Sequence, residues 1–181
     1  MGRLRVTKKQ FRKEVLRRRR LISEDEYALR NALLVEKFYS FFQDTEAECV
    51  HSYLSIRKNK EPQTQMLINY FLHSGVRVLV SKSDFISCTM RHFVYDHRMV
   101  LVENDYGIPE PESGEEVDFA DADIVLVPLL TFDKKGNRMG YGKGFYDRLL
   151  AQARPDTMKV GMSLTTPFDE FPFVEPHDIS L

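Results

Sequence analysis

Apolar positions early in the chain recur at the spacing of two amphipathic helices. Phe11, Val15 and Ile22 fall on one face of a first helix, whose basic residues lie mostly elsewhere. Ser23, with Glu26 three residues later, forms a capping box, which marks the start of a second helix that we expect to run to about residue 42. The chain therefore opens with two helices.

A strand, a helix and a second strand are predicted next. Residues 49–54 and 76–80 are short apolar runs typical of buried strands, and residues 65–73 form a helical segment closed by Gly75. Such a connection returns the chain parallel and right-handed, which predicts a parallel or mixed sheet covered by helices. Because ligands gather beyond the carboxyl ends of such strands, residues 54–61 are a candidate site wall.

The second half of the chain alternates strand patterns with loops. Residues 91–95 and 99–102 predict a hairpin around residues 96–98. The remaining expected elements are a strand at 124–127, a helix at 145–153, a strand at 158–162 and an extended segment at 171–178 that is broken by prolines.

Length and composition favour one domain, residues 1–181, with 43% hydrophobic residues. We predict a cytoplasmic protein, because no apolar run could span a bilayer and the basic N-terminus lacks the apolar core of a secretory signal. Cys49 and Cys88 lie far apart without metal-ligand or Cys-x-x-Cys spacing, so we interpret them as reduced thiols. The five histidines also lack metal-ligand spacing, and we interpret none of them as a catalytic base.

Charge is distributed unevenly along the chain. Residues 1–20 carry ten Lys or Arg and a single acid, whereas residues 103–123 are acidic and contain no base. A basic helical arm is a candidate for nucleic-acid binding, yet no recognition module accompanies it. Within this arm Lys8 and Arg12 are four positions apart and share a helix face, where they either meet one polyanion or face solvent.

A glycine-rich loop stands out after the apolar run at 124–127. Gly140, Gly142 and Gly144 alternate along it, so its backbone can adopt positive φ and bring N–H groups close to an anion. The helix that follows would add unpaired N–H groups and a partial positive charge. The loop is not a Walker A motif, because Lys143 is followed by Gly144, and it is not a dinucleotide fingerprint, because Phe145 occupies the third glycine position. The alternative is a mobile surface turn.

The segment as a whole resembles one family. Residues 123–133 and 136–148 are similar to the signature of 5-formyltetrahydrofolate cyclo-ligase, also called methenyltetrahydrofolate synthetase. Weaker similarity extends to residues 8–12, 54–64, 106–111 and 175–178. The chain departs from the family pattern at Ser81, where proline is common, at Phe145, where tyrosine is usual, and in a longer loop around 57–60.

The resemblance implies both a fold and a reaction. The fold would be a three-layer α/β structure of the ribose-phosphate-isomerase and CoA-transferase type, with a parallel or mixed sheet and helices on both faces. The reaction would convert 5-formyltetrahydrofolate and Mg-ATP to 5,10-methenyltetrahydrofolate, ADP and phosphate. The formyl oxygen would attack the γ-phosphate, N10 would close on the activated carbon, and phosphate would leave. Such chemistry needs positioning and charge neutralisation more than a protein nucleophile.

The resemblance also assigns roles to residues. Arg138 and Lys143 would be catalytic through their charge, and we expect their replacement to lower turnover while stability barely changes. Asp147 and Asp178 would hold Mg²⁺. The implied ATP site comprises Lys8, Lys9, Gln10, Phe11, Arg12, Arg138, Met139, Gly140, Tyr141, Gly142, Lys143, Gly144, Phe145 and Tyr146. The implied folate site comprises Leu54, Glu61, Tyr141, Gly142, Lys143, Gly144 and Phe145.

Two broader expectations accompany these assignments. We expect a monomer that binds 5-formyltetrahydrofolate and ATP, with no membrane and no specific nucleic-acid partner. The alternative is a non-catalytic relative that binds RNA or a protein through its basic first helix.

Overall fold

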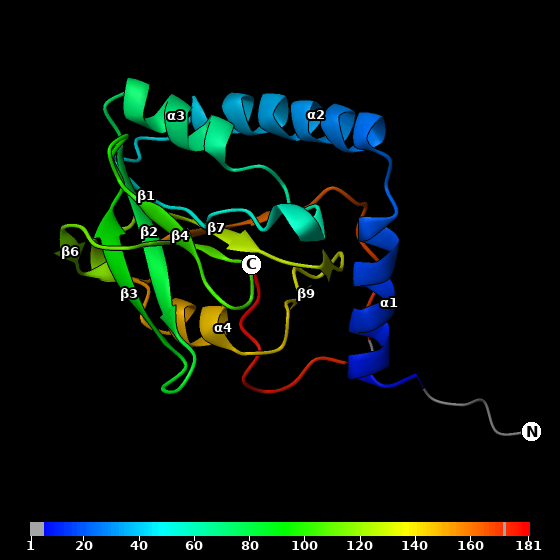
Figure 1. The fold of residues 1–181 in the computed structure, drawn as a ribbon. Coiled ribbons are helices and arrows are strands. Elements are labelled where there is room, and N and C mark those ends of the chain that lie inside the picture. Colours follow the sequence, from blue (N-terminus) through cyan, green and yellow to red (C-terminus); the bar gives the residue numbers. More distant parts are fainter. Residues whose placement is uncertain (1–5, 172) are drawn as a thin grey trace, which may run out of the picture.

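A mixed six-stranded sheet forms the centre of the computed structural model, which describes residues 6–171 and 173–181 (Figure 1). Its strand order is β10-β7-β1-β2-β3-β6, in which the first four strands run parallel and the last two antiparallel to their neighbours. The strands are β1 Cys49–His51, β2 Arg77–Asp84, β3 Thr89–Val94, β6 Glu116–Val117, β7 Ile124–Pro128 and β10 Met158–Met162.

The sheet is apolar on both faces where it is parallel. In β7 four successive residues from Ile124 onward are buried, because alternate side chains enter two different cores. Leu126 packs with Phe38 and Phe71 on one face, whereas Val125 packs with Leu149 on the other. The strand is therefore a continuous apolar run rather than an alternating one.

Helices cover both faces of the sheet, which confirms the predicted three-layer fold. Figure 1 shows α2 (Glu24–Phe42) and α3 (Gln65–His73) on one side and the short α4 (Phe145–Leu150) on the other, with α1 (Lys8–Arg20) standing at the end of the sheet. The Ser23 hydroxyl accepts a hydrogen bond from the Glu26 N–H at 3.2 Å, so α2 begins at the predicted cap. The predicted strand-helix-strand unit is also confirmed, because β1, α3 and β2 form a parallel pair with its crossover.

The predicted hairpin is wrong. The structure instead pairs β3 with β2, while β4 (Leu101–Glu103) pairs with β5 (Pro109–Pro111) in a separate two-stranded sheet. A tight turn explains the difference: the Asp84 carboxylate accepts hydrogen bonds from Ile86 N and Ser87 N, and Cys88 adopts a φ of 56°. The chain therefore reverses directly after β2, before the segment that the sequence pattern assigned to the turn.

Four other boundaries differ from the prediction. α1 ends at Arg20, before Ile22, and β1 ends at His51 rather than at residue 54. β2 continues to Asp84, and α4 ends at Leu150 rather than at residue 153. Two short 3-10 helices, η1 (Arg57–Asn59) and η2 (Phe119–Asp121), lie in the connections. β8 (Thr131–Phe132) and β9 (Arg138–Met139) form a small hairpin that leads into the glycine-rich loop.

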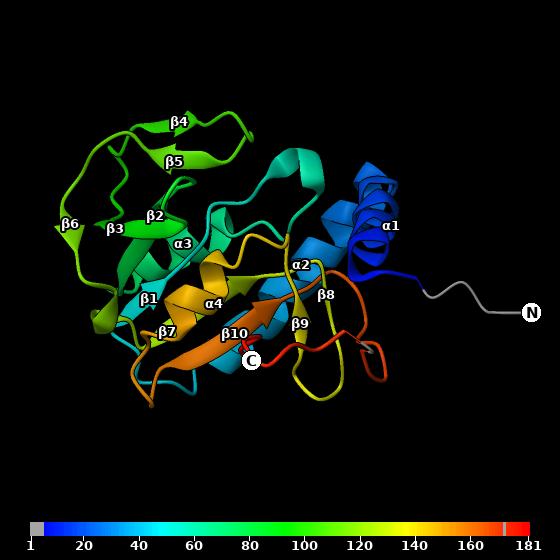
Figure 2. The ribbon, with the colours of Figure 1, turned by 90° about the horizontal axis from the view of Figure 1, so that it is seen from below.

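Residues 171–178, predicted as an extended segment broken by prolines, contain turns and no strand in their described part, and Pro172 lies outside the described residues. In Figure 2 this segment runs from the end of the small β8–β9 hairpin back toward β10. Leu181 N donates to Gly136 O at 3.0 Å, which fastens the end of the chain to that hairpin. None of the helices that the structure describes is both long and apolar enough to cross a membrane.

Candidate active site

A cavity of about 650 Å³ lies beyond the carboxyl ends of the parallel strands. Its walls come from α1, the segment after β1, the far end of β2, the glycine-rich loop and the C-terminal segment. The loop therefore faces a built cavity rather than open solvent. Most of the residues that the sequence resemblance assigned line this one space: Lys8, Arg12, Leu54, Glu61, residues 138–147 and Asp178.

The glycine-rich loop is shaped to receive α1. Gly142 has a φ of 89°, and a Cβ there would lie 2.8 Å from the Arg12 guanidinium carbon, so only glycine allows this approach. Arg12 Nε donates to Gly140 O at 3.1 Å. Gly144, with a φ of 70°, stands at the N-terminus of α4. The loop and the first helix thus form one wall of the cavity.

Cationic side chains gather around this wall in different states of pairing. Lys8 Nζ lies 2.9 Å from Asp178 Oδ2 and 3.1 Å from Glu175 Oε1. The Arg138 side chain is 5% exposed, and its Nη2 lies 2.7 Å from Asp147 Oδ1. Lys143 is exposed, and its ammonium stands 5.7 Å from the centre of the Tyr106 ring. These positive charges suit a polyanion.

Three residues of the implied ATP site lie outside the cavity wall. Lys9 is exposed. The Gln10 side chain accepts from Thr7 N at 2.9 Å and completes the capping box of α1. Phe11 packs its ring against Phe168 and Phe173, with centroids 5.4 and 5.5 Å away. Gln10 and Phe11 therefore make capping and packing contacts rather than contacts with the cavity.

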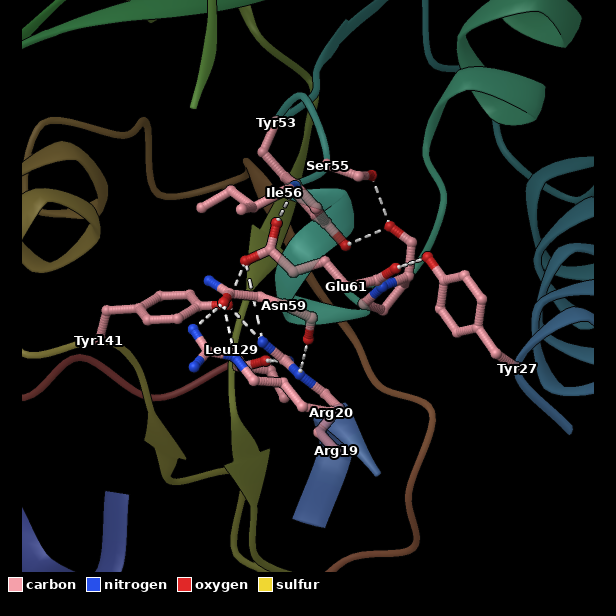
Figure 3. A network of polar contacts seen from close by, with 11 residues as sticks. Arg19, Arg20, Tyr27, Tyr53, Ser55, Ile56, Asn59, Glu61, Leu129 and Tyr141 are labelled. Atoms are coloured by element: carbon pink, nitrogen blue, oxygen red, sulfur yellow. Dashed lines mark hydrogen bonds and ion pairs between the residues drawn. The ribbon is translucent and has the colours of Figure 1, made fainter. Parts of the chain in front are cut away.

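Glu61 is the most deeply placed acid of the cavity, with 2% of its surface exposed. Its Oε2 accepts from Ile56 N at 2.6 Å, and its Oε1 accepts from the Tyr141 hydroxyl (Figure 3). Burial is the main cause that raises the pKa of Glu61 above its ordinary value, against the hydrogen bonds and the Arg19 charge that lower it. Burial likewise raises the pKa of the Tyr141 hydroxyl, which therefore keeps its proton and donates it.

Arg19 completes this network and is not among the site residues predicted from the sequence. Its side chain is 4% exposed: Nε donates to Asn59 O at 2.8 Å, Nη1 to Leu129 O at 2.9 Å, and Nη2 to the Tyr141 hydroxyl. Nη2 also lies 4.0 Å from Glu61 Oε1. Its position, seven residues after Arg12, places it on the cavity face of α1, and that spacing could have identified it.

The donor set near the C-terminal segment fits a hard cation. Asp147 and Asp178 both line the cavity, and Asp147 Oδ1 also accepts from Ile179 N at 3.3 Å, which brings the two acids into one neighbourhood. Glu175, His177 and Asp178 place their ligand atoms within 4.8 Å of one another. Carboxylate oxygens suit Mg²⁺. Because Lys8 already pairs with two of these acids, cation binding there would compete with its ammonium.

Aromatic side chains form another part of the cavity wall. The Tyr106 ring stacks on Phe85 with centroids 4.2 Å apart, and Phe85 meets Phe145 edge-on at 5.1 Å. All three residues line the cavity, together with Leu54. Such a surface presents flat apolar area to a planar ring system.

Known proteins are similar to this chain in sequence and in fold. The model of the "5-formyltetrahydrofolate cyclo-ligase family" matches residues 5–181. A 5-formyltetrahydrofolate cyclo-ligase of Mycolicibacterium smegmatis is 30% identical over 159 residues, which cover 77% of this chain and 80% of that protein. The mouse enzyme of the same name is 28% identical over 150 residues, with coverages of 79% and 73%. The NMR structure of Aquifex aeolicus 5,10-methenyltetrahydrofolate synthetase has a TM-score of 0.80 at 28% identity and covers 96% of this chain and 86% of that one.

Proposed function

This chain belongs to the 5-formyltetrahydrofolate cyclo-ligase family, and we propose that its cavity converts 5-formyltetrahydrofolate and ATP to 5,10-methenyltetrahydrofolate, ADP and phosphate. One observation supports this proposal above the others: a single cavity joins a cationic glycine loop to a buried acid and an aromatic wall. The first half suits a triphosphate, and the second suits a pterin ring. The two reactants would thus meet where the walls join.

The phosphate half is built from α1 and the glycine loop. We assign phosphate contacts to Lys8, Arg12 and Lys143, together with the loop amides that glycine leaves unshielded. As the formyl oxygen attacks the γ-phosphate, negative charge spreads over the phosphate oxygens, and fixed cations stabilise it without reorganising. Arg138 would contribute to the same field and also hold Asp147 in place. No protein nucleophile is required.

The folate half is built around Glu61. Its carboxylate can accept hydrogen bonds from N–H groups of the pterin, and its network with Tyr141 and Arg19 fixes its orientation before the substrate binds. Leu54 and Phe145 would cover the ring faces. Because Tyr141 belongs to the glycine loop and donates to Glu61, its side chain ties the phosphate half to the folate half.

Mg²⁺ fits the acids at the C-terminal end of the cavity. Asp147 and Asp178 would hold it, and the bound ion would neutralise charge on the triphosphate. Lys8 would then be released from Asp178 toward the phosphates.

The basic first helix is used by the enzyme rather than by RNA in this proposal. Arg12 and Arg19 point into the cavity wall, while Arg17 and Arg18 both pair with Glu14 on the helix itself. We further propose that the protein is a monomer. We also propose that it is cytoplasmic, because its two free cysteines are consistent with a reducing compartment.

Two substitutions separate the halves of the cavity. Glu61→Gln should raise the KM for 5-formyltetrahydrofolate and leave the KM for ATP nearly unchanged. Lys143→Ala should raise the KM for ATP and leave the KM for 5-formyltetrahydrofolate nearly unchanged. Both constants come from initial rates of methenyl product formation with the other substrate saturating. If both variants change the same constant, or neither changes one, the assignment of the two halves is wrong.

A further inference from the structure

A buried Ser–His–His cluster lies in the wall of the cavity and has no part in the roles assigned so far. His51 ends β1, Ser81 lies in β2 and His92 lies directly opposite Ser81 in β3. The Ser81 hydroxyl is 2.7 Å from His51 Nε2 and 3.0 Å from His92 Nδ1. Ser81 lines the cavity, whereas His51 is fully buried and His92 is 8% exposed. The two strands that flank β2 thus each aim an imidazole at the hydroxyl on the strand between them.

The proton positions in this cluster follow from counting donors. His51 Nδ1 is buried and has no hydrogen-bond partner among the described residues. An orphaned acceptor is tolerated better than an orphaned N–H, so the proton of His51 belongs on Nε2, from which it is donated to Ser81. The single hydroxyl proton of Ser81 is then donated to His92 Nδ1. Burial lowers the pKa of His51 to about 3 and lowers that of His92, so both rings are neutral at neutral pH.

This arrangement leaves Ser81 with one free lone pair on the cavity side. The hydroxyl has used its proton on His92 and one lone pair on His51, so the remaining lone pair can accept a hydrogen bond from a ligand N–H. Glu61, which accepts from Ile56 and Tyr141, is already assigned to the N–H groups of the pterin ring. The acids at the phosphate end are paired with Lys8 and Arg138.

We propose that Ser81 and His92 take up the proton that N10 of the folate loses when the ring closes; this inference rests on the proposed function. As N10 forms its bond to the activated formyl carbon, its proton passes to Ser81 Oγ and the Ser81 proton passes to His92 Nδ1. The carbon–oxygen bond then breaks, and its electron pair leaves with phosphate. Ser81 is thus a catalytic residue that touches substrate, and His51 positions it.

The surroundings of His92 suit a transient positive charge. Asp118 and Glu116 are the acids that act on this ring and favour its charged form, whereas burial disfavours it. His51 faces it edge-on at a centroid distance of 5.3 Å and stays neutral. The Phe119 ring covers both imidazoles. His92 rather than His51 would return the proton to solvent, because His92 is 8% exposed whereas His51 is fully buried.

Ser83 offers a matched control for Ser81. It lies two positions further along β2, on the same face of the strand, and it lines the same cavity, but its hydroxyl bonds to no other described side chain. We expect Ser81→Ala to lower kcat by about 10²-fold with the KM for ATP unchanged, because general-base catalysis contributes at least that much. Ser83→Ala should stay within about twofold of wild type.

The role of His92 is separated from mere packing by its conservative variant. His92→Asn can still accept the Ser81 hydrogen bond through its amide oxygen, but it cannot bind the proton. We expect the kcat of His92→Asn to be lowered as much as that of Ser81→Ala. In wild type kcat should decrease at acid pH because His92 becomes protonated, and this decrease should be absent in His92→Asn. A purely structural histidine would leave that acid limb in place.

A measurement without turnover completes the test. Nitrogen-15 NMR of the histidine rings should show both His51 and His92 protonated at Nε2. Addition of 5-formyltetrahydrofolate without ATP should change the chemical shift of His92 Nδ1 in wild type and in Ser83→Ala, but not in Ser81→Ala. Equal rates and equal spectra for the two serine variants would overturn the proposal. Failure of wild type to form methenyl product would instead refute the proposed function, while the NMR comparison still reports on the Ser81–His92 hydrogen bond.

Discussion

Arg138 and Lys143 carry the same charge in the same loop region, yet their replacement should affect stability very differently. Arg138 is 5% exposed and pairs at 2.7 Å with Asp147, which is 22% exposed. Removing one partner of a fully buried pair costs about 3–5 kcal/mol, but water and Ile179 N still reach Asp147, so we expect about 2–3 kcal/mol for Arg138→Ala. In a chain of this size that lowers Tm by roughly 5–10 °C. This burial revises the sequence-based expectation that neither substitution changes stability.

Lys143→Ala should leave stability almost unchanged, because its side chain is exposed and forms no ion pair with a described residue. We expect a change within about 0.5 kcal/mol, as for other surface substitutions. Both variants should lose about 10²-fold in kcat, as is common for a fixed charge facing a developing negative charge. Lys37→Ala, on the exposed side of α2, is the control for losing a surface charge.

The assays are thermal unfolding by circular dichroism and initial rates with saturating substrates, at one salt concentration for all variants. Equal Tm values for Arg138→Ala and Lys143→Ala would refute the structural role of the Arg138–Asp147 pair. A near-wild-type rate in Lys143→Ala would show that this ammonium does not face the transferred phosphate.

Three further outcomes are expected. Asp147→Asn should raise the Mg²⁺ concentration needed for half-maximal rate at saturating ATP, and Asp178→Asn should raise it less; an unchanged requirement in Asp178→Asn removes that residue from the metal site. Burial raises the pKa of Glu61 in the folded state above the ordinary value that it has in the unfolded chain. Between these two pKa values the folded chain keeps a proton on Glu61 that the unfolded chain has lost. The unfolding free energy, measured by urea titration, should therefore fall as pH rises through that window. Glu61→Gln should lack this fall. The same pH dependence in Glu61→Gln as in wild type would contradict the expectation. RNA binding should be weak and fall log-linearly with salt, and tight sequence-selective binding at physiological salt would support the RNA-binding alternative.

Much of the framework could be predicted from local patterns. Ser23 and Glu26 located the start of α2, and the apolar runs of β1 and β2 on either side of α3 predicted a parallel sheet with covering helices. These signals are local, since they depend on a cap or on the periodicity of a few neighbouring residues. The alternating glycines around Gly142 also predicted an anion-binding loop.

The features that could not be predicted depend on contacts between distant segments. β3 was assigned to the wrong hairpin because strand pairing is decided by the turn at Asp84 and by the partners available to β4. Arg19 was counted among the basic residues that lie away from the apolar face of the first helix, although its guanidinium reaches Leu129 O, 110 positions away. The histidines have no metal-ligand spacing in the sequence, so none was interpreted as a catalytic base, and the proposal for His92 replaces that interpretation. Only the register of β1, β2 and β3 places His51 and His92 on either side of Ser81.

Formation of the methenyl product tests the proposed activity most directly. The purified chain is incubated with 5-formyltetrahydrofolate, Mg²⁺ and ATP while the absorbance of the methenyl chromophore is followed, with an ATP-free sample as control. We expect the absorbance to rise only when ATP is present, with ADP formed in equal amount. A folded wild-type chain that gives no product above the ATP-free control would contradict the assignment of this cavity as the active site of a cyclo-ligase.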